Sequence, residues 1–334
     1  MIYFVTGATG FIGGRLVRIL LDDGHQVHIL ARRPHRALEL KKRGARIFQG
    51  DILDKASMLA PMKNCDGIFH IAADYGLGVR DRASMYKTNV RGTRNVLSLM
   101  RELSIPAGVY TSTIAINSDT RGVMADESYF FQGSHLSWYA ETKWKAHYDV
   151  AMPFIHDDLP LTIVQPCLVY GPGDQSAIAL TLEQFLRGRL PFLPAETRYC
   201  WAHVDDIAQG HFLAMKQGRQ GESYVLGGPD HSLREAFRIA SRLTRRRVPP
   251  ISVPPIAMRF LASFASLVEN SFRLPPHLSS ESLLMSAGTT HIASSEKAET
   301  EFGYSCRSLE VGLKGTLADL AARISRKLER AVSK

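Results

Sequence analysis

Six short runs of β-branched and apolar residues alternate with longer amphipathic segments in the first half of the chain. Each run is too short for a stable helix, and the segment after it carries apolar residues at helical spacing, so the alternation predicts repeated strand–helix–strand units. Units of this kind form a parallel sheet with helices on both faces. We therefore expect an α/β protein built on a doubly wound parallel sheet. The predicted strands are Ile2–Thr6, Val27–Leu30, Arg46–Gln49, Gly67–Ile71, Gly108–Thr111 and Thr162–Gln165.

A glycine-rich turn, Thr6-Gly7-Ala8-Thr9-Gly10-Phe11-Ile12-Gly13, follows the first strand and opens a predicted helix at Ile12–Leu21. The first glycine permits a tight turn, the second lets the backbone approach a pyrophosphate, and the third allows the helix to pack closely on the strand. The amino end of the helix attracts the anion. The pattern predicts a Rossmann dinucleotide-binding domain rather than an ordinary strand-to-helix turn. Its cofactor-binding candidates here are Gly7, Thr9, Gly10, Phe11, Ile12 and Gly13.

The end of the second strand indicates which nicotinamide cofactor is bound. NAD enzymes usually place an acidic residue there to bind the ribose 2′-hydroxyl. This strand instead ends in Arg32 and Arg33, and no carboxylate follows until Glu39. Because an arginine can pair with a 2′-phosphate, we expect NADP(H), with Arg32 ahead of Arg33 as its partner. The alternative is NAD(H), with both arginines merely exposed to solvent.

Tyr139 and Lys143 lie four residues apart in a segment predicted to be helical, so they share one helical face. A lysine ammonium favours the phenolate and brings the ordinary tyrosine pKa of about 10 towards working pH. Thr113 ends the sequence Thr111-Ser112-Thr113 at the carboxyl end of the fifth strand, where ligands bind in open α/β sheets. We expect the Thr113 hydroxyl to bond a substrate oxygen while Tyr139 exchanges its proton. The alternatives are a plain helix surface for the Tyr–Lys pair and strand-end caps for Thr111 and Ser112.

The second half of the chain is less regular. Turn signals become frequent after Pro166, so residues 166–202 and 227–334 are predicted to form a smaller substrate-binding lobe. Residues 1–165 are predicted to form the Rossmann domain. The chain is expected to return to it at 203–226, where Ser223–Leu226 is typical of a strand.

Further motifs follow the glycine turn in a fixed order. They are Gly50-Asp51-Ile52, His70-Ile71-Ala72-Ala73, Asn89–Leu97, Thr111-Ser112-Thr113, Pro166 with Val169–Asp174, and His203–Ala208. Together with the Tyr–Lys pair, they resemble the motifs of extended short-chain dehydrogenases/reductases over essentially the full length of the chain.

The resemblance also implies roles for individual residues. Asp51 and Ile52 would border the adenine, Ala72 and Ala73 would line the cofactor path, and Asn89 would prop the cofactor loop. Lys143 would also hold the nicotinamide ribose, and the backbone from Pro166 to Val169 would contact the nicotinamide. Thr111 and Tyr139 complete the set of cofactor-binding candidates.

Within that family, the stretches His70–Leu77 and Asn89–Leu97 look most like the dihydroflavonol-reductase-like and 3β-hydroxysteroid-dehydrogenase-like branch, which includes bacterial proteins labelled hopanoid-associated sugar epimerases. Two departures bear on the reaction. Ile114-Ala115 stands where nucleotide-sugar dehydratases carry an Asp-Glu pair, so dehydration is not expected. Tyr199 stands where sugar-nucleotide epimerases commonly carry an arginine, with Arg198 one place off.

These features together predict an NADP(H)-dependent oxidoreductase that interconverts a ketone and a secondary alcohol on a fairly hydrophobic small molecule. The alternatives are a nucleotide-sugar epimerase with tightly bound NAD(P) and a non-catalytic NAD(P)-binding regulatory protein. The substrate walls are expected from the loop Asp74–Val79 and from aromatic side chains, unless these belong to the core. The aromatic candidates are Tyr170, Phe185, Phe192, Tyr199, Trp201 and Phe260.

The charge of the chain limits its partners. Its 334 residues carry a formal net charge of +9, with basic clusters at Arg242–Arg247 and Arg323–Arg330. We expect a solvated basic face, with anionic lipid or an acidic substrate as alternatives. Nucleic acid is not expected, because no basic motif is interleaved with aromatic residues.

The amino terminus lacks the pattern of a secretory signal, so a cytoplasmic protein is expected. The four cysteines are scattered singly, and no metal site is predicted. The apolar tract Ile256–Val268 is too short to cross a bilayer. We expect a helix that covers the second lobe, with membrane docking as the alternative. By resemblance, a homodimer is expected through helices at Asp81–Leu103 and Ser137–His156.

Overall fold

The computed structural model describes residues 1–76, 81–269, 272 and 274–332. Its centre is a seven-stranded sheet of order β10-β6-β5-β4-β1-β2-β3, in which every neighbouring pair is parallel. The order reverses between β1 and β4, which is where open α/β sheets bind ligands. The strands are β1 (Ile2–Thr6), β2 (Gln26–Ala31), β3 (Arg46–Gln49), β4 (Gly67–His70), β5 (Gly108–Thr111), β6 (Leu161–Pro166) and β10 (Ser223–Leu226).

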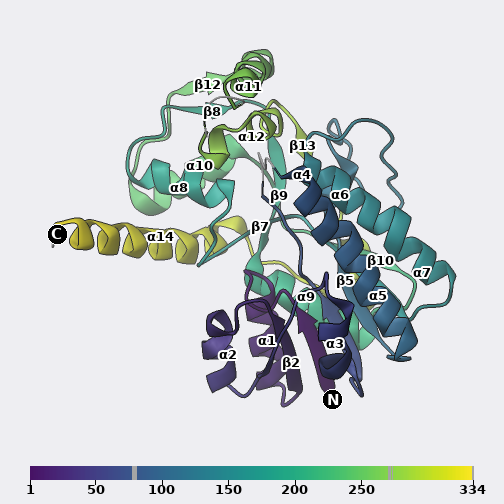
Figure 1. Cartoon of the computed structure of the whole chain (residues 1–334). Coiled ribbons are helices and arrows are strands. Elements are labelled where there is room, and N and C mark those ends of the chain that lie inside the picture. The colour runs from purple at the N-terminus through teal and green to yellow at the C-terminus, as the bar shows by residue number, and fades with distance from the viewer. Residues whose placement is uncertain (77–80, 270–271, 273, 333–334) are drawn as a thin grey trace.

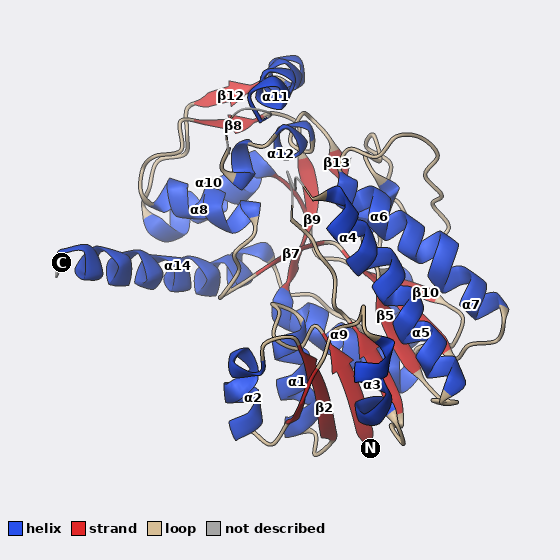
Figure 2. Cartoon of the chain, in the orientation of Figure 1, coloured by secondary structure: helices blue, strands red, loops and turns tan. Residues whose placement is uncertain are grey.

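Helices cover both faces of this sheet (Figures 1 and 2). One face packs on α1 (Gly13–Asp22), α2 (Leu38–Lys42), α9 (Val204–Gln217) and α13 (Glu296–Phe302). The other face packs on α3 (Lys55–Met62), α5 (Thr93–Glu102), α6 (Trp138–Ala146) and α7 (Met152–His156). Apart from the edge strand β3, the strands between them are almost wholly buried, as a sheet covered on both faces requires. The predicted doubly wound α/β fold is confirmed.

One expectation about the sheet was wrong. The sixth strand was expected to lead into a helix, as the earlier strands do. Instead β6 ends at Pro166 and the chain continues as a short strand, β7 (Leu168–Tyr170), which leaves the sheet and pairs with β9 (Arg198–His203). Proline has no backbone N–H to donate, so it fits the end of the strand, where the chain changes partners.

The remaining elements form a second lobe above the carboxyl edge of the sheet (Figure 1). Here β9 pairs with β7, β11 (Asp230–Ser232) and β13 (Thr290–His291), and β8 (Phe192–Pro194) pairs with β12 (Ile251–Val253). The helices of this lobe are α8 (Ala177–Leu186), α10 (Leu233–Thr244), α11 (Pro255–Glu269), α12 (Ser280–Leu284) and α14 (Leu309–Val332). Within the described residues, no helix combines the length and the apolar character that crossing a bilayer demands.

The two helices expected at Asp81–Leu103 and Ser137–His156 are each interrupted by a π-helical segment. The first consists of α4 (Arg82–Tyr86), the π segment Lys87–Gly92 and α5, and the second of α6, the π segment His147–Ala151 and α7. Such segments are frequent at functional sites, because the wider helical turn changes the direction in which side chains point. The first one carries Asn89, and the second begins with His147.

Buried histidines fix the hydroxyl groups at the carboxyl ends of β1 and β5. The pairs are Thr6 Oγ1 with His70 Nδ1 at 2.8 Å, Thr111 Oγ1 with His211 Nε2 at 2.9 Å, and Ser112 Oγ with His147 Nδ1 at 2.9 Å. Burial lowers the pKa of all three rings, to about 3 for His70 and His147 and to about 4 for His211. The rings are therefore neutral in the folded protein at neutral pH.

We expect the free energy of unfolding to fall as the pH drops below about 6.5, the ordinary histidine pKa. Below that pH the unfolded chain binds protons at these histidines, whereas the folded chain does so only near their lowered pKa values of about 3 to 4. Extra proton binding by the unfolded state favours unfolding, by up to about 1.4 kcal/mol per pH unit for each histidine. Urea unfolding from neutral pH to about pH 5 measures this dependence.

Two variants separate this effect from the titration of carboxylates. His211→Gln keeps a hydrogen-bonding side chain but does not titrate, so its pH dependence should be shallower than that of the wild type. His35 is exposed, and His35→Gln should leave the dependence unchanged. Equal dependence in all three proteins would contradict neutral, buried histidines.

Candidate active site

The glycine turn after β1 is pressed between α1 and the end of β4. Gly7 has a φ of +73°, and a Cβ added there would lie 2.7 Å from the Ala72 nitrogen. A Cβ on Gly13 would lie 2.3 Å from the Gly7 carbonyl oxygen. No side chain fits either position, which agrees with the tight turn predicted at Gly7 and the close packing of helix on strand predicted at Gly13. Gly10 is exposed on the outside of the turn.

The amino end of α1 is open to an anion. The helix begins at Gly13, one residue later than expected, and no side chain caps it. Within the described chain, the N–H groups of Phe11, Ile12 and Gly13 have no internal acceptor, and no acidic residue lies in the first turn. Free N–H groups at a helix amino end suit a phosphate, so this turn fits the pyrophosphate of a dinucleotide. Thr9 is exposed beside them.

Arg32 and Arg33 lie at the carboxyl end of β2, the neighbour of β1 in the sheet. Both side chains are exposed, and that of Arg32 forms no hydrogen bond or ion pair with any described residue. Arg33 precedes the short 3₁₀ helix Pro34–Ala37, and its carbonyl accepts the Arg36 N–H at 3.0 Å. A guanidinium that is free of internal partners is available to a phosphate on the adenosine ribose.

The turns after β3 and β4 hold the other residues expected near the cofactor. Asp51 Oδ1 accepts the Leu53 N–H at 3.0 Å, and Ile52 is buried against Gly92, where a Cβ would meet its side chain at 2.5 Å. Ala72 follows β4, with its N–H bonded to Thr6 Oγ1 at 3.2 Å. The turn after β4 stands beside the glycine turn, because β4 is the other neighbour of β1, whereas β3 is separated from β1 by β2.

Asn89 joins the loop after β4 to α6. Its Oδ1 accepts the Asp74 N–H at 2.7 Å, and its Nδ2 donates to the Asp74 carbonyl at 2.8 Å and to Thr142 Oγ1 at 3.0 Å. Asn89 is fully buried, so its side chain is committed to these bonds. The geometry suits the propping role that the resemblance implies. Ala73 lies in the same loop.

Thr113, Tyr139 and Lys143 come together where β5 ends and α6 begins. Ser137 caps α6, with its Oγ accepting the Ala140 N–H at 3.2 Å. Tyr139 and Lys143 follow one turn apart on the face towards β5. Burial raises the pKa of Tyr139 to about 12, and a hydrogen bond with Thr113 opposes this rise. The Thr113 hydroxyl also reaches the Pro166 carbonyl at 3.5 Å, which places it beside the turn that leads to Val169.

Lys143 is only 2% exposed, and its ammonium is held by two oxygen atoms of β5. Nζ donates to the Tyr110 hydroxyl at 2.9 Å and to the Thr111 carbonyl at 2.7 Å. Burial lowers the Lys143 pKa to about 7. Because the pKa of Tyr139 is raised to about 12, its neutral phenol is the form present at neutral pH, and this is the form that donates a proton.

The strand-end hydroxyls divide into two groups. Thr111 and Ser112 point to the buried histidines of α9 and of the π segment, so their side chains face away from the cluster. Their hydroxyls bond histidines rather than cap a loop, and Thr111 reaches the cluster through its carbonyl group. Thr113 alone turns its hydroxyl towards Tyr139.

A hydrogen-bond chain extends from Lys143 to the glycine turn. The Tyr110 hydroxyl lies close enough to Thr93 for it to affect the Tyr110 pKa, and Thr93 Oγ1 lies 3.0 Å from His70 Nε2 and donates to the Asn89 carbonyl at 2.6 Å. Thr6 Oγ1 accepts two backbone N–H groups after β4, so it donates its own proton to His70 Nδ1. His70 is therefore the Nε2-protonated neutral tautomer, and each bond in the chain has one donor and one acceptor.

Sequence reasoning had no role for Tyr110, His70, Thr93 or His147. One signal was present in the sequence, since His70 is a polar residue at the end of an apolar strand. In the structure, β4 and β5 place His70 directly opposite Tyr110. Their rings stack with centroids 5.5 Å apart.

Most of the aromatic side chains expected to line the substrate site lie in the core. Tyr170, Phe185 and Trp201 are buried in the second lobe, Tyr199 stacks on His291 with centroids 5.4 Å apart, and Phe192 packs on α11 and α12. The core alternative holds for them, and Phe260 is exposed. Tyr75, from the loop after β4, is close enough to Tyr139 to raise its pKa. Residues 77–79 of the expected wall lie outside the described residues.

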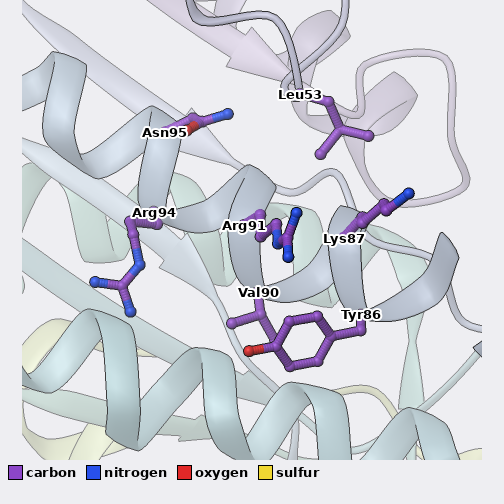
Figure 3. Close-up of a pocket in the computed structure, with 7 residues that line it drawn as sticks. All are labelled: Leu53, Tyr86, Lys87, Val90, Arg91, Arg94 and Asn95. Carbon is purple, nitrogen blue, oxygen red and sulfur yellow. The ribbon is translucent and has the colours of Figure 1, made fainter. Parts of the chain in front are cut away.

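A separate hollow of about 530 Å³ lies on the outer surface of α4, the first π segment and α5 (Figure 3). It contains none of the catalytic candidates. The homodimer expected through this helix and its neighbour stays a prediction. The lining residues are Leu53, Tyr86, Lys87, Val90, Arg91, Arg94 and Asn95.

Comparison with known sequences adds independent support. A sequence model of the NAD dependent epimerase/dehydratase family matches residues 3–227. A protein of Synechocystis sp. provisionally named dihydroflavonol 4-reductase is 35% identical over 260 residues, which are 75% of each chain. The 2-alkyl-3-oxoalkanoate reductase of Shewanella oneidensis is 27% identical, over 95% of this chain and 86% of that one.

Two solved structures illustrate the likeness in three dimensions. The crystal structure of gox2253 has a TM-score of 0.83 at 30% identity and covers 96% of this chain and 98% of that one. The UDP-glucose 4-epimerase of Thermotoga maritima has a TM-score of 0.77 at 23% identity, covering 97% and 100%, which shows a shared fold alone. The chain belongs to the NAD dependent epimerase/dehydratase family and is an NAD(P)-dependent oxidoreductase of the extended short-chain dehydrogenase/reductase type.

Proposed function

We propose that this chain is an NADP(H)-dependent reductase that interconverts a ketone and a secondary alcohol on a fairly hydrophobic small molecule. One observation carries the proposal. The Tyr139 phenol, kept protonated at neutral pH, stands beside the Thr113 hydroxyl and one helical turn from a buried Lys143. Two relatives named as reductases support it, one of them acting on a 2-alkyl-3-oxoalkanoate, a ketone with alkyl chains.

In the reducing direction, the Thr113 hydroxyl orients the substrate carbonyl oxygen and Tyr139 donates its proton to that oxygen. The bound nicotinamide supplies the hydride that the carbonyl carbon accepts. The Lys143 ammonium, one helical turn away, stabilises the phenolate left on Tyr139, because opposite charges attract more strongly in a buried site than in water. Oxidation of the alcohol reverses these steps, with Tyr139 accepting the proton.

The reductase is favoured over the nucleotide-sugar epimerase by the state of Arg198. This arginine is the nearest candidate for a sugar diphosphate, but it forms ion pairs with Asp230 at 3.0 Å and Glu235 at 3.6 Å. A diphosphate would have to displace two carboxylates. The non-catalytic alternative is disfavoured because Thr113, Tyr139 and Lys143 are all present and brought together.

The decisive experiment follows nicotinamide absorbance with purified protein, NADPH or NADH, and a panel of hydrophobic ketones and UDP-sugars. Steady oxidation of NADPH by a ketone is expected, and Tyr139→Phe should abolish it because the phenol supplies the proton. Conversion of a UDP-sugar to its epimer without net NADPH consumption would refute the reductase and establish the epimerase.

Arg32→Ala should raise the KM for NADPH roughly 10- to 100-fold, because a charge-assisted hydrogen bond contributes about 1.5 to 3 kcal/mol. The KM for NADH should change little, since that cofactor has no 2′-phosphate. Arg46→Ala removes an exposed arginine at the opposite end of the neighbouring strand, and it should change neither value. Equal effects of Arg32→Ala on the two cofactors would refute the assignment of Arg32 to the 2′-phosphate.

Tyr110→Phe should lower the pKa of Lys143 from about 7 by about one unit, because the charged ammonium loses one of its two acceptors. Lysine labelled with ¹³C at Cε reports this titration by NMR, and Lys143→Arg identifies the resonance. Activity at alkaline pH should decline at a correspondingly lower pH, since the ammonium is the active form. Tyr148→Phe, on the π segment after α6, should leave the titration unchanged, and an unshifted pKa in Tyr110→Phe would contradict the role of its hydroxyl.

A further inference from the structure

Helix α11 presents a row of large apolar side chains to solvent. Ile256, Phe260, Phe264 and Leu267 are between 66% and 72% exposed. Their spacing of four, four and three residues places them on one side of the helix. Soluble proteins bury or scatter such side chains, so a continuous row on one helix indicates a surface that meets another apolar phase.

The opposite side of α11 is buried and holds the helix against the second lobe. Met258, Ala262 and Ala265 are buried and pack with Leu283 of α12. The helix therefore covers the second lobe, as expected from the sequence, and keeps its second apolar face free. Figures 1 and 2 show α11 at the outer end of that lobe, far from the large sheet.

The charged residues before and within most of this row are arginines. Residues 236–268 contain six arginines and no aspartate, glutamate or lysine. Arg259 lies on α11 itself, and Arg245, Arg246 and Arg247 lie in the loop before β12; all four are exposed and form no ion pair within the described part of the chain. The one carboxylate of α11, Glu269, accepts the backbone N–H and hydroxyl of Ser280 at 2.9 and 2.7 Å, so it is held towards α12.

We propose that α11 and the arginine loop 245–247 form a docking surface for a bilayer of anionic phospholipids. Exposed apolar side chains on one helix face, with Arg259 on the same helix and three more unpaired arginines in the loop before β12, fit the interface between acyl chains and anionic headgroups. A helix of 15 residues is about 22 Å long, so it lies in the plane of the interface rather than across the bilayer. A protein partner would need an acidic rim around an apolar groove.

The docking surface is connected to the candidate active site through α12. Glu281 of α12 accepts the backbone N–H of Trp138 at 3.0 Å, at the first residue of α6 and next to Tyr139. The α11–α12 pair thus contacts the helix that carries the catalytic candidates. Docking does not require the proposed reductase activity, although a lipid-soluble ketone would then reach the site from the membrane side.

Flotation with vesicles tests the docking directly. The full chain is mixed with vesicles of phosphatidylcholine alone, or of phosphatidylcholine with phosphatidylglycerol, at low and high salt. We expect binding to the mixed vesicles, weaker binding to the neutral ones and a loss with salt, because arginine–headgroup attraction is screened. No binding to the mixed vesicles would overturn the proposal.

Variants assign the binding to α11. Phe260→Ser with Phe264→Ser should weaken binding to the mixed vesicles at least roughly tenfold, since about 0.8 kcal/mol is lost for each CH₂ withdrawn from the apolar phase. Val311→Ser removes an equally exposed apolar side chain from α14 and should leave binding unchanged. An equal loss of vesicle binding in both variants, or no loss in the α11 variant, would contradict the assignment of binding to α11.

Two further measurements keep the result unambiguous. Circular dichroism and thermal unfolding of the double variant should match those of the wild type, because the replaced phenylalanines are exposed. If the double variant is unstable, Phe264→Trp takes its place. A blue shift of the tryptophan emission is then expected when mixed vesicles are added. Gel filtration without vesicles tests a second copy of this chain as the occupant. An oligomer that the α11 substitutions dissociate would show that α11 joins protein chains instead.

Discussion

The burial of the Lys143 ammonium is the constraint on which the candidate site depends. A charge removed from water is tolerated only where acceptors replace the solvent, and both acceptors here lie on β5. They therefore fix α6 at one position against the end of that strand. The same position lets Thr142 meet Asn89 and His147 meet Ser112. A shift of α6 by one residue would break all of these bonds at once.

Sequence reasoning reached the parts of the site that are local in the chain. The glycine turn, the Thr-Ser-Thr strand end and the Tyr–Lys spacing each lie within eight residues, and periodicity alone places them at one edge of the sheet. The buried network could not be predicted from the sequence, because its members come from five separate elements. They are Thr6, His70, Thr93, Tyr110 and Lys143. Their partners are set by strand register and by the π segments, which local propensity does not encode. Most of the aromatic residues predicted as substrate walls pack in the core for a related reason, since composition does not distinguish a core face from a pocket.

The second lobe shows how the same fold can favour one substrate class over another. In this chain the arginine of β9 is neutralised by Asp230 and Glu235, and the strand carries Tyr199 at the neighbouring position, turned towards His291. The positive charge of Arg198 is thus not available to bind a diphosphate. The unpaired arginines lie instead on the outside, around a helix with an exposed apolar face. This distribution suits an apolar substrate better than a doubly charged sugar nucleotide.

The pKa values of the catalytic candidates define which protonation states are present at neutral pH. With the Tyr139 pKa raised to about 12 and the Lys143 pKa lowered to about 7, the phenol holds its proton while the ammonium is near its titration point. Any anion brought close to Lys143 would raise its pKa and keep it charged, and a charged Lys143 in turn lowers the pKa of Tyr139. Burial of a single lysine thus links the protonation of Lys143 to that of Tyr139.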